Sequence, residues 1–119
     1  DALHADAAAL RARQLIESDL ERAHTLARRA VRLRGGPDAL EILGRTHLAR
    51  GNPEPASKAL GRALELEPDR PSTRYWLGRA LAAIGDAAGA QRELNAAIAA
   101  GDFPERADAQ AELARMTAD

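Results

Sequence analysis

Apolar residues recur along this chain at intervals of three and four, the spacing that places them on one side of a helix. Between residues 37 and 50 this side carries Leu40, Leu43 and Leu48. Gly51 suits the end of that helix, and Pro53 suits the first turn of the next one. A second apolar run follows, and its members are Ala56, Leu60, Ala63, Leu64 and Leu66. The pattern predicts two helices joined by a short turn.

The same pattern returns 34 residues later along the chain. The first set of residues is Pro37, Leu43, Gly44, Gly51, Ala56, Leu60, Ala63 and Leu64; the second is Pro71, Leu77, Gly78, Gly85, Ala90, Leu94, Ala97 and Ile98. A fixed period of this size is typical of stacked supersecondary units, each of which buries its apolar side against its neighbours.

The small residues of the period predict close helix packing. A glycine inside a helix costs about 1 kcal/mol relative to alanine, so Gly44 and Gly78 at matching places indicate a steric need. We expect them to let the two helices of each hairpin approach closely, with Ala56 and Ala90 where the second helix crosses the first.

These residues resemble the tetratricopeptide repeat, whose pattern reads W-x2-L-G-x2-Y and then G, A, F, A and P. Residues 37–70 and 71–104 each carry the Leu-Gly pair, the turn glycine and the later alanines. The chain departs from this pattern at three positions. Leu40 and Arg74 replace the opening aromatic, His47 and Leu81 replace the tyrosine, and Asp102 replaces the closing proline of the second copy. The resemblance implies an all-α fold, a right-handed superhelical stack of helix-turn-helix repeats.

A weaker copy precedes these two, and one more helix follows them. In residues 4–36, Leu10, Ala23, Ala27, Ala30, Val31 and Leu33 match the second copy at a spacing of 33, with Arg11 where glycine is expected. We read 4–36 as a degenerate repeat and 105–117 as a capping helix that covers the last repeat. Residues 1–119 are expected to form a single domain.

Composition and charge exclude several classes of protein. The chain has no Cys and a net charge of −1, and its basic residues alternate with acids, which disfavours nucleic-acid binding. It has no apolar run long enough to span a membrane. Sixteen of the seventeen basic residues are Arg, which together with the abundant Ala suggests a bacterial source. We expect a soluble protein of the bacterial cytoplasm or periplasm, excised or processed from a longer one.

No arrangement of residues points to catalysis, a metal or another cofactor. His4, His24 and His47 lie far apart in sequence without a second ligand at metal spacing. His47 occupies a packing position of the repeat, which favours a hydrogen-bonded core histidine. No Ser or Thr stands beside a His with an acidic partner. The chain is therefore expected not to be an enzyme.

The resemblance implies that the first helix of each repeat lines a concave groove. The positions beside the packing residues select Glu41 and Arg45 in one repeat, and Tyr75, Trp76 and Arg79 in the next. Arg45 and Arg79 are equivalent, and Glu41 is placed to pair with Arg45 one turn on. Aromatic and Arg side chains are enriched in binding hot spots. Tyr75 is expected in the groove, whereas Trp76 fits groove or core equally.

Two classes of function remain open. The first is a non-catalytic module that binds a partner peptide or helix in the groove, with an acidic side chain on Arg79 or Arg45 and an apolar one on the rings. The second is a structural spacer within a longer repeat array or scaffold of a bacterial multiprotein, possibly envelope, assembly, where exposed repeat ends favour self-association.

Overall fold

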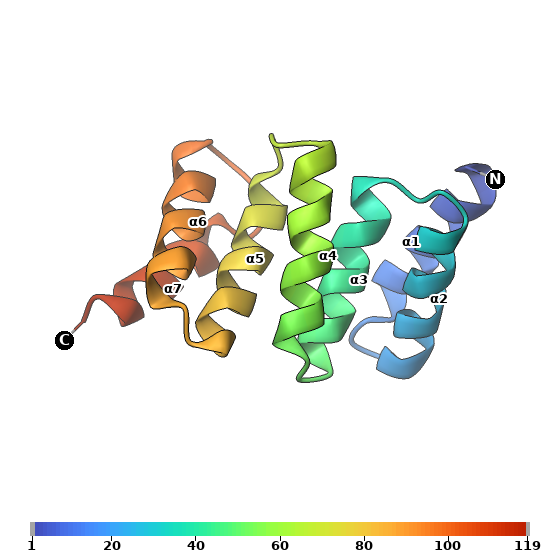
Figure 1. Ribbon diagram of the computed structural model, residues 1–119, viewed down its shortest axis with the longest axis horizontal. Helices are drawn as coiled ribbons and strands as arrows, with labels where there is room; N and C mark the ends of the chain where they lie inside the picture. Colours follow the sequence, from blue (N-terminus) through green and yellow to red (C-terminus); the bar gives the residue numbers. More distant parts are fainter. Residues whose placement is uncertain (1, 119) are drawn as a thin grey trace.

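The computed structural model describes residues 2–118, and within them it contains seven helices and no strand (Figure 1). The helices are α1 (Ala2–Leu15), α2 (Leu20–Arg32), α3 (Pro37–Ala49), α4 (Pro53–Leu66), α5 (Pro71–Ile84), α6 (Ala87–Ala99) and α7 (Arg106–Met116). They follow one another along a body of 46 × 26 × 21 Å. The expected all-α superhelical repeat is confirmed.

The helices form two layers that differ in how closely their members approach. α1, α3, α5 and α7 contact one another in succession, whereas contacts of α2, α4 and α6 run to the first layer and not to each other within the described residues. The layer of α1, α3, α5 and α7 is therefore the shorter, inner side of the curve. Figure 1 is viewed with α2, α4 and α6 toward the reader.

The second and third hairpins confirm the packing role of the two glycines. A Cβ atom built on Gly44 would lie 2.5 Å from the Cγ atom of Leu60, and one built on Gly78 would lie 2.9 Å from the Cγ atom of Leu94. Both leucines are fully buried. Each leucine of the second helix thus occupies the space that a side chain on the first helix would need. Leu66 differs from expectation and is 63% exposed, because it ends α4 one turn beyond the last buried residue, Ala63.

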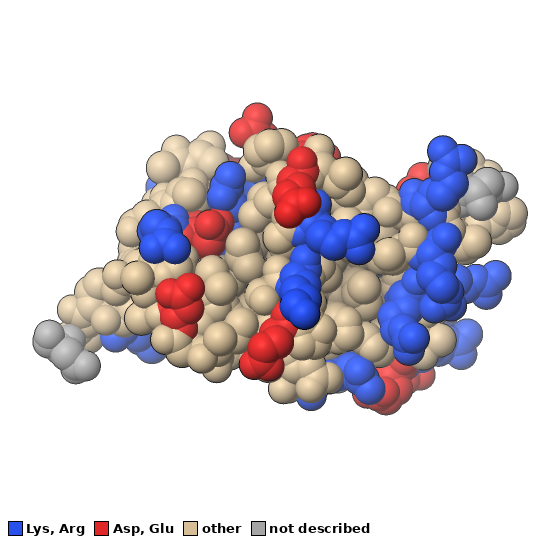
Figure 2. All heavy atoms as spheres, viewed as in Figure 1, with Lys and Arg blue, Asp and Glu red and all other residues tan. Residues whose placement is uncertain are grey.

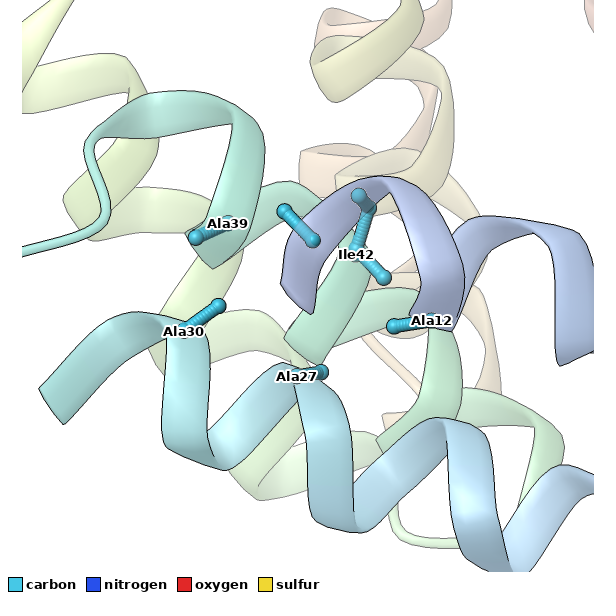
Figure 3. Packing of buried hydrophobic residues seen from close by; sticks show 6 residues of the cluster. Ala12, Ala27, Ala30, Ala39 and Ile42 are labelled. Atoms are coloured by element: carbon cyan, nitrogen blue, oxygen red, sulfur yellow. The ribbon is translucent and has the colours of Figure 1, made fainter. Parts of the chain in front are cut away.

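The first hairpin packs by alanine instead (Figure 3). Ala12 from α1 and Ala27 from α2 are fully buried, in a cluster that α3 completes with Ile42. The expected match of Leu10 and Arg11 to Leu43 and Gly44 is wrong by one residue, since Leu10 and Arg11 are exposed. Ala12 takes the buried place that glycine holds in the other two hairpins.

The turns follow the expected chemistry at most positions. Gly51 and Gly85 adopt φ values of 82° and 102°, a left-handed backbone that glycine enters without steric cost. Asp86 caps α6 by accepting a hydrogen bond of 2.8 Å from the backbone N–H of Gly89. Asn52 precedes α4 but makes no side-chain cap.

α7 covers the end of the stack. Its Ala109 is fully buried and shares a cluster with Tyr75 and Leu94, against which Phe103 and Leu113 are partly buried. This helix therefore removes the apolar side of the third hairpin from solvent.

Candidate partner-binding site

The inner layer brings the five residues singled out from the sequence onto two neighbouring helices. Glu41 and Arg45 stand one turn apart on α3, and Tyr75, Trp76 and Arg79 occupy the facing part of α5. The repeat places them there because α3 and α5 are equivalent inner helices that contact each other. The five residues are not equally accessible, however.

Two guanidinium groups lie close to the ring of Trp76. The Cζ atom of Arg45 is 4.7 Å from the centroid of the Trp76 ring, and that of Arg79 is 5.4 Å away. Both distances fall within the range of cation–π attraction, and the two cations come from different helices. Trp76 is half-buried and also packs against a buried cluster formed by Ala56, Leu60 and Ala80. It therefore faces core on one edge and the inner surface on the other.

A pocket of about 200 Å³ opens beside this arrangement, and we call it the Trp76 pocket. Part of its wall is apolar and comes from α3 and from Ile16, the residue after α1. The rest consists of the Trp76 ring, the two arginines and one carboxylate. Its lining residues are Ile16, Glu17, Arg45, Leu48, Ala49, Trp76 and Arg79.

Two buried donors at the Trp76 pocket lack a hydrogen-bond partner within the described residues. They are the indole Nε1–H of Trp76 and the Nε–H of Arg45. Burial lowers the pKa of Arg45, while the charges of Glu41 and Glu105 act in the opposite direction. Arginine remains protonated in proteins, so the site offers positive charge, through the exposed guanidinium of Arg79, to a group with acceptor oxygens.

Tyr75 is less accessible than expected, with 5% of its surface exposed. Its ring meets that of Trp76 edge to face at 4.8 Å and packs against Leu94 and Ala109. Burial raises the pKa of Tyr75, and nearby Arg79 opposes the shift. α7 covers the ring, so Tyr75 supports Trp76 and Arg79 rather than offering a broad open surface.

Glu41 is engaged inside the molecule, and its expected pairing with Arg45 is wrong. It accepts a hydrogen bond of 3.1 Å from Nη2 of Arg70 and a short one from the hydroxyl of Thr73. Arg70 also contacts Asp38 at 2.7 Å. Burial alone would lower the pKa of Arg70, but its hydrogen bonds and the charges of Asp38 and Glu41 outweigh this and raise it. This network joins α3 to the start of α5.

The hydrogen-bonded core histidine is His24 rather than His47. Nδ1 of His24 lies 2.9 Å from the Thr46 hydroxyl, which itself donates to the Leu43 carbonyl. The hydroxyl proton is therefore used, and His24 must be the donor to Thr46. His47 meets the His24 ring edge to face at 4.6 Å, and its Nδ1 has no hydrogen-bond partner within residues 2–118.

A larger hollow lies elsewhere, between the turn before α5 and the end of α6, with a volume of about 690 Å³. Its wall is mainly proline and alanine, from Pro68, Pro71, Ala96, Ala99 and Ala100, together with Asp69, Arg70 and Arg74. Both arginines are already bound, Arg70 as above and Arg74 to Glu93 and the Pro68 carbonyl. The sequence reasoning missed this hollow, whose only signal is a row of alanines on α6. The Trp76 pocket, by contrast, includes Arg79, an exposed arginine without an ion pair among the described residues.

The described residues hold no group of three or more His, Cys, Asp or Glu side chains that could bind a metal ion. No helix among them is both long enough and apolar enough to cross a membrane.

The sequence model of the tetratricopeptide repeat matches residues 43–90. No curated protein sequence matches the chain.

Among solved structures, the chain is similar to a mutant of the Thermobaculum terrenum O-GlcNAc transferase, with 26% identity and a TM-score of 0.86. The likeness covers 97% of this chain but only 22% of the transferase. The Yersinia enterocolitica type III secretion translocator chaperone SycD superimposes with a TM-score of 0.81 at 18% identity, over 98% of this chain and 90% of SycD. SycD in complex with a peptide of the translocator YopD gives 0.78 at 18% identity, over 93% and 87% of the two chains. At 18% identity, the likeness to SycD shows a shared fold and no more.

Proposed function

We propose that this chain, a member of the tetratricopeptide repeat family, is a non-catalytic module that binds a segment of a partner protein on its inner face. The observation that carries the proposal is the half-buried Trp76, whose ring lies within cation–π distance of Arg45 and Arg79 beside an open pocket. Aromatic and Arg side chains of this kind dominate the binding energy of protein interfaces.

The chemistry of the pocket selects the partner segment. An acidic side chain of the partner would meet the exposed guanidinium of Arg79. A neighbouring apolar side chain would rest on Trp76 and on the apolar wall at Leu48. Such a segment combines an acidic residue with an adjacent apolar one.

Related folds support this assignment. SycD, which shares the fold, has been solved with a peptide of the translocator YopD, so a stack of this size can hold a partner peptide. The transferase likeness concerns a repeat region that spans 22% of that enzyme, and no transferase activity is carried over to this chain.

Trp76 provides a direct test because it is the only Trp in the chain. Candidate partners are first captured from the native host with the wild-type domain. Their binding is then measured as a change in the fluorescence of Trp76. We expect Arg79→Glu to weaken binding about thirtyfold or more, since a central contact is worth about 2 kcal/mol. Arg92→Glu is the matched control, because Arg92 is an exposed arginine of the outer helix α6. Equal binding by both variants would place the functional surface away from the Trp76 pocket.

A second candidate function is a spacer within a longer array. Leu3 and Leu10, two turns apart on α1, are 81% and 55% exposed, as expected of a surface that another repeat or a second copy covers. Sedimentation tests this candidate: the wild-type domain should self-associate, and Leu3→Asp with Leu10→Asp should make it monomeric. A monomeric wild type would count against the spacer.

A further inference from the structure

The outer helix of the first hairpin carries a positively charged surface that the inner-face site does not explain. Arg28, Arg29, Arg32 and Arg34 are all exposed, and we call them the α2 arginine face. In Figure 2, basic side chains gather at the α2 end of the molecule, whereas both signs of charge are mixed over the α4 and α6 end.

These four arginines form no ion pair within residues 2–118, whereas some arginines elsewhere in the chain do. Arg50 pairs with Glu21 at 3.0 Å, Arg74 with Glu93 at 2.9 Å, and Arg70 with several carboxylates. Other exposed arginines, such as Arg62 and Arg92, are also without an ion pair among the described residues, but on the α2 arginine face four unpaired arginines fall within seven residues of sequence. These like charges stand on the last turns of α2 and just past its end, so they repel one another, and an acidic partner would relieve this repulsion.

The other repeats act as an internal control. At the spacing of 33, the positions equivalent to the α2 arginine face on the second hairpin are Gly61, Arg62, Glu65 and Glu67. On the third hairpin they are Asn95, Ala96, Ala99 and Gly101. The inward positions keep small or apolar side chains in all three, as in Ala30, Ala63 and Ala97, each fully buried. The repeat framework thus demands small core residues but not arginine on its outer side.

Arg34 strengthens the distinction. Its φ of 71° is the one left-handed value at a non-glycine position within the described residues, a conformation unfavourable for a residue with a Cβ atom. Gly35 follows it and is needed for close packing, since a Cβ there would lie 2.5 Å from that of Ala39. An arginine at the strained position extends the row of cations past the end of α2.

We propose that the α2 arginine face is a second docking surface, and that its occupant is a short acidic segment of a protein. The charge of the rest of the chain selects this occupant. The net charge of −1 leaves −5 once the four arginines are set aside, so the rest of the chain has no excess of positive charge that could extend the contact to a long polyanion or an anionic membrane. From Arg28 to Arg32 the helix rises about 6 Å, which suits a few carboxylates rather than an extended lattice of phosphates. This inference is independent of the inner-face site, because it concerns the opposite layer.

The probe for this surface is a short fluorescein-labelled peptide of alternating Glu and Ala, followed by fluorescence anisotropy. The test variant is Arg29→Gln with Arg32→Gln. The matched control is Lys58→Gln with Arg62→Gln, which removes the same charge from exposed positions of α4, Arg62 being the repeat equivalent of Arg29. Neither pair takes part in an ion pair or in the core, so circular dichroism should show unchanged helicity.

We expect the peptide to bind the wild type and the control alike, and the test variant about tenfold more weakly. Binding should also weaken as salt rises from about 0.05 M to about 0.15 M. A short DNA duplex and vesicles containing phosphatidylserine serve as competing probes. Tighter binding of either one than of the peptide, an equal loss in the control, or no binding of the peptide would overturn the proposal.

Discussion

The first and second hairpins pack their helices with different pairs of side chains. α1 and α2 meet through Ala12 and Ala27, whereas α3 and α4 meet through Gly44 and Leu60. All four residues are buried. In the second hairpin a large side chain enters the space that a missing one leaves, and the third repeats this choice with Gly78 and Leu94.

The difference concerns where each hairpin obtains its stability. Leucine buries three more carbons than alanine, worth about 2 kcal/mol at about 0.8 kcal/mol each. Leu60 contributes this within its own hairpin, but Ala27 does not. The first hairpin instead relies on its seam with α3, where Ile42 completes the alanine cluster and His24 bonds to Thr46. We therefore expect the two hairpins to respond differently to core changes, acid and added side-chain bulk.

The largest effect should come from removing the leucine. Leu60→Ala is expected to lower the free energy of unfolding by about 2–5 kcal/mol, because it deletes a fully buried side chain against a glycine that cannot fill the space. Urea unfolding followed by circular dichroism measures the loss. Leu10→Ala on the first hairpin is the control and should change stability little, since Leu10 is 55% exposed. Similar losses in the two variants would remove the distinction between the hairpins.

Acid should weaken the seam of the first hairpin with α3. Burial, followed by the charge of Arg50 and by His47, lowers the pKa of His24 from 6.5 to about 4. Burial, Arg50 and Arg28 also lower the pKa of His47. As pH falls below about 6.5 the unfolded chain therefore takes up protons that the folded chain does not. Stability is full above that pH and decreases down to about 4, by at most about 3 kcal/mol for His24.

The measurement is urea unfolding at a series of pH values for the wild type and for His24→Asn. The variant keeps a side-chain donor for Thr46 but does not titrate in this range, so its stability should depend less on pH. An equally steep pH dependence in the variant would show that other groups carry the effect.

The fold could be predicted because its signals are local. The positions of Gly44, Leu60 and their equivalents follow from helix periodicity and from a repeat that occurs twice. The predicted match of α1 to the later repeats is one residue out of register because α1 is rich in alanine, as at Ala8, Ala9 and Ala12, so its buried side hardly differs in sequence from its other sides.

The site could be predicted only in part, because its contacts are not local. That Arg45 and Arg79 would lie near each other follows from the repeat, and both do flank Trp76. The burial of Tyr75 depends on α7, and the engagement of Glu41 depends on Arg70 and Thr73 from the next repeat. Neither can be read from the helix on which the residue itself stands.

The smallest and most discriminating effects concern two glycines of the second hairpin. Gly44→Ala places a Cβ atom 2.5 Å from the Cγ atom of Leu60 and should cost about 1–3 kcal/mol. Gly61 lies on α4, and a Cβ atom added there would have nothing within 4 Å. Gly61→Ala should therefore raise the free energy of unfolding by up to about 1 kcal/mol through helix propensity. The substitution is the same, and only the facing side chain differs. Thermal unfolding of the two variants should therefore move in opposite directions from the wild type. A gain at both positions would mean that Leu60 can move aside, and that glycine is not what allows α3 and α4 to approach.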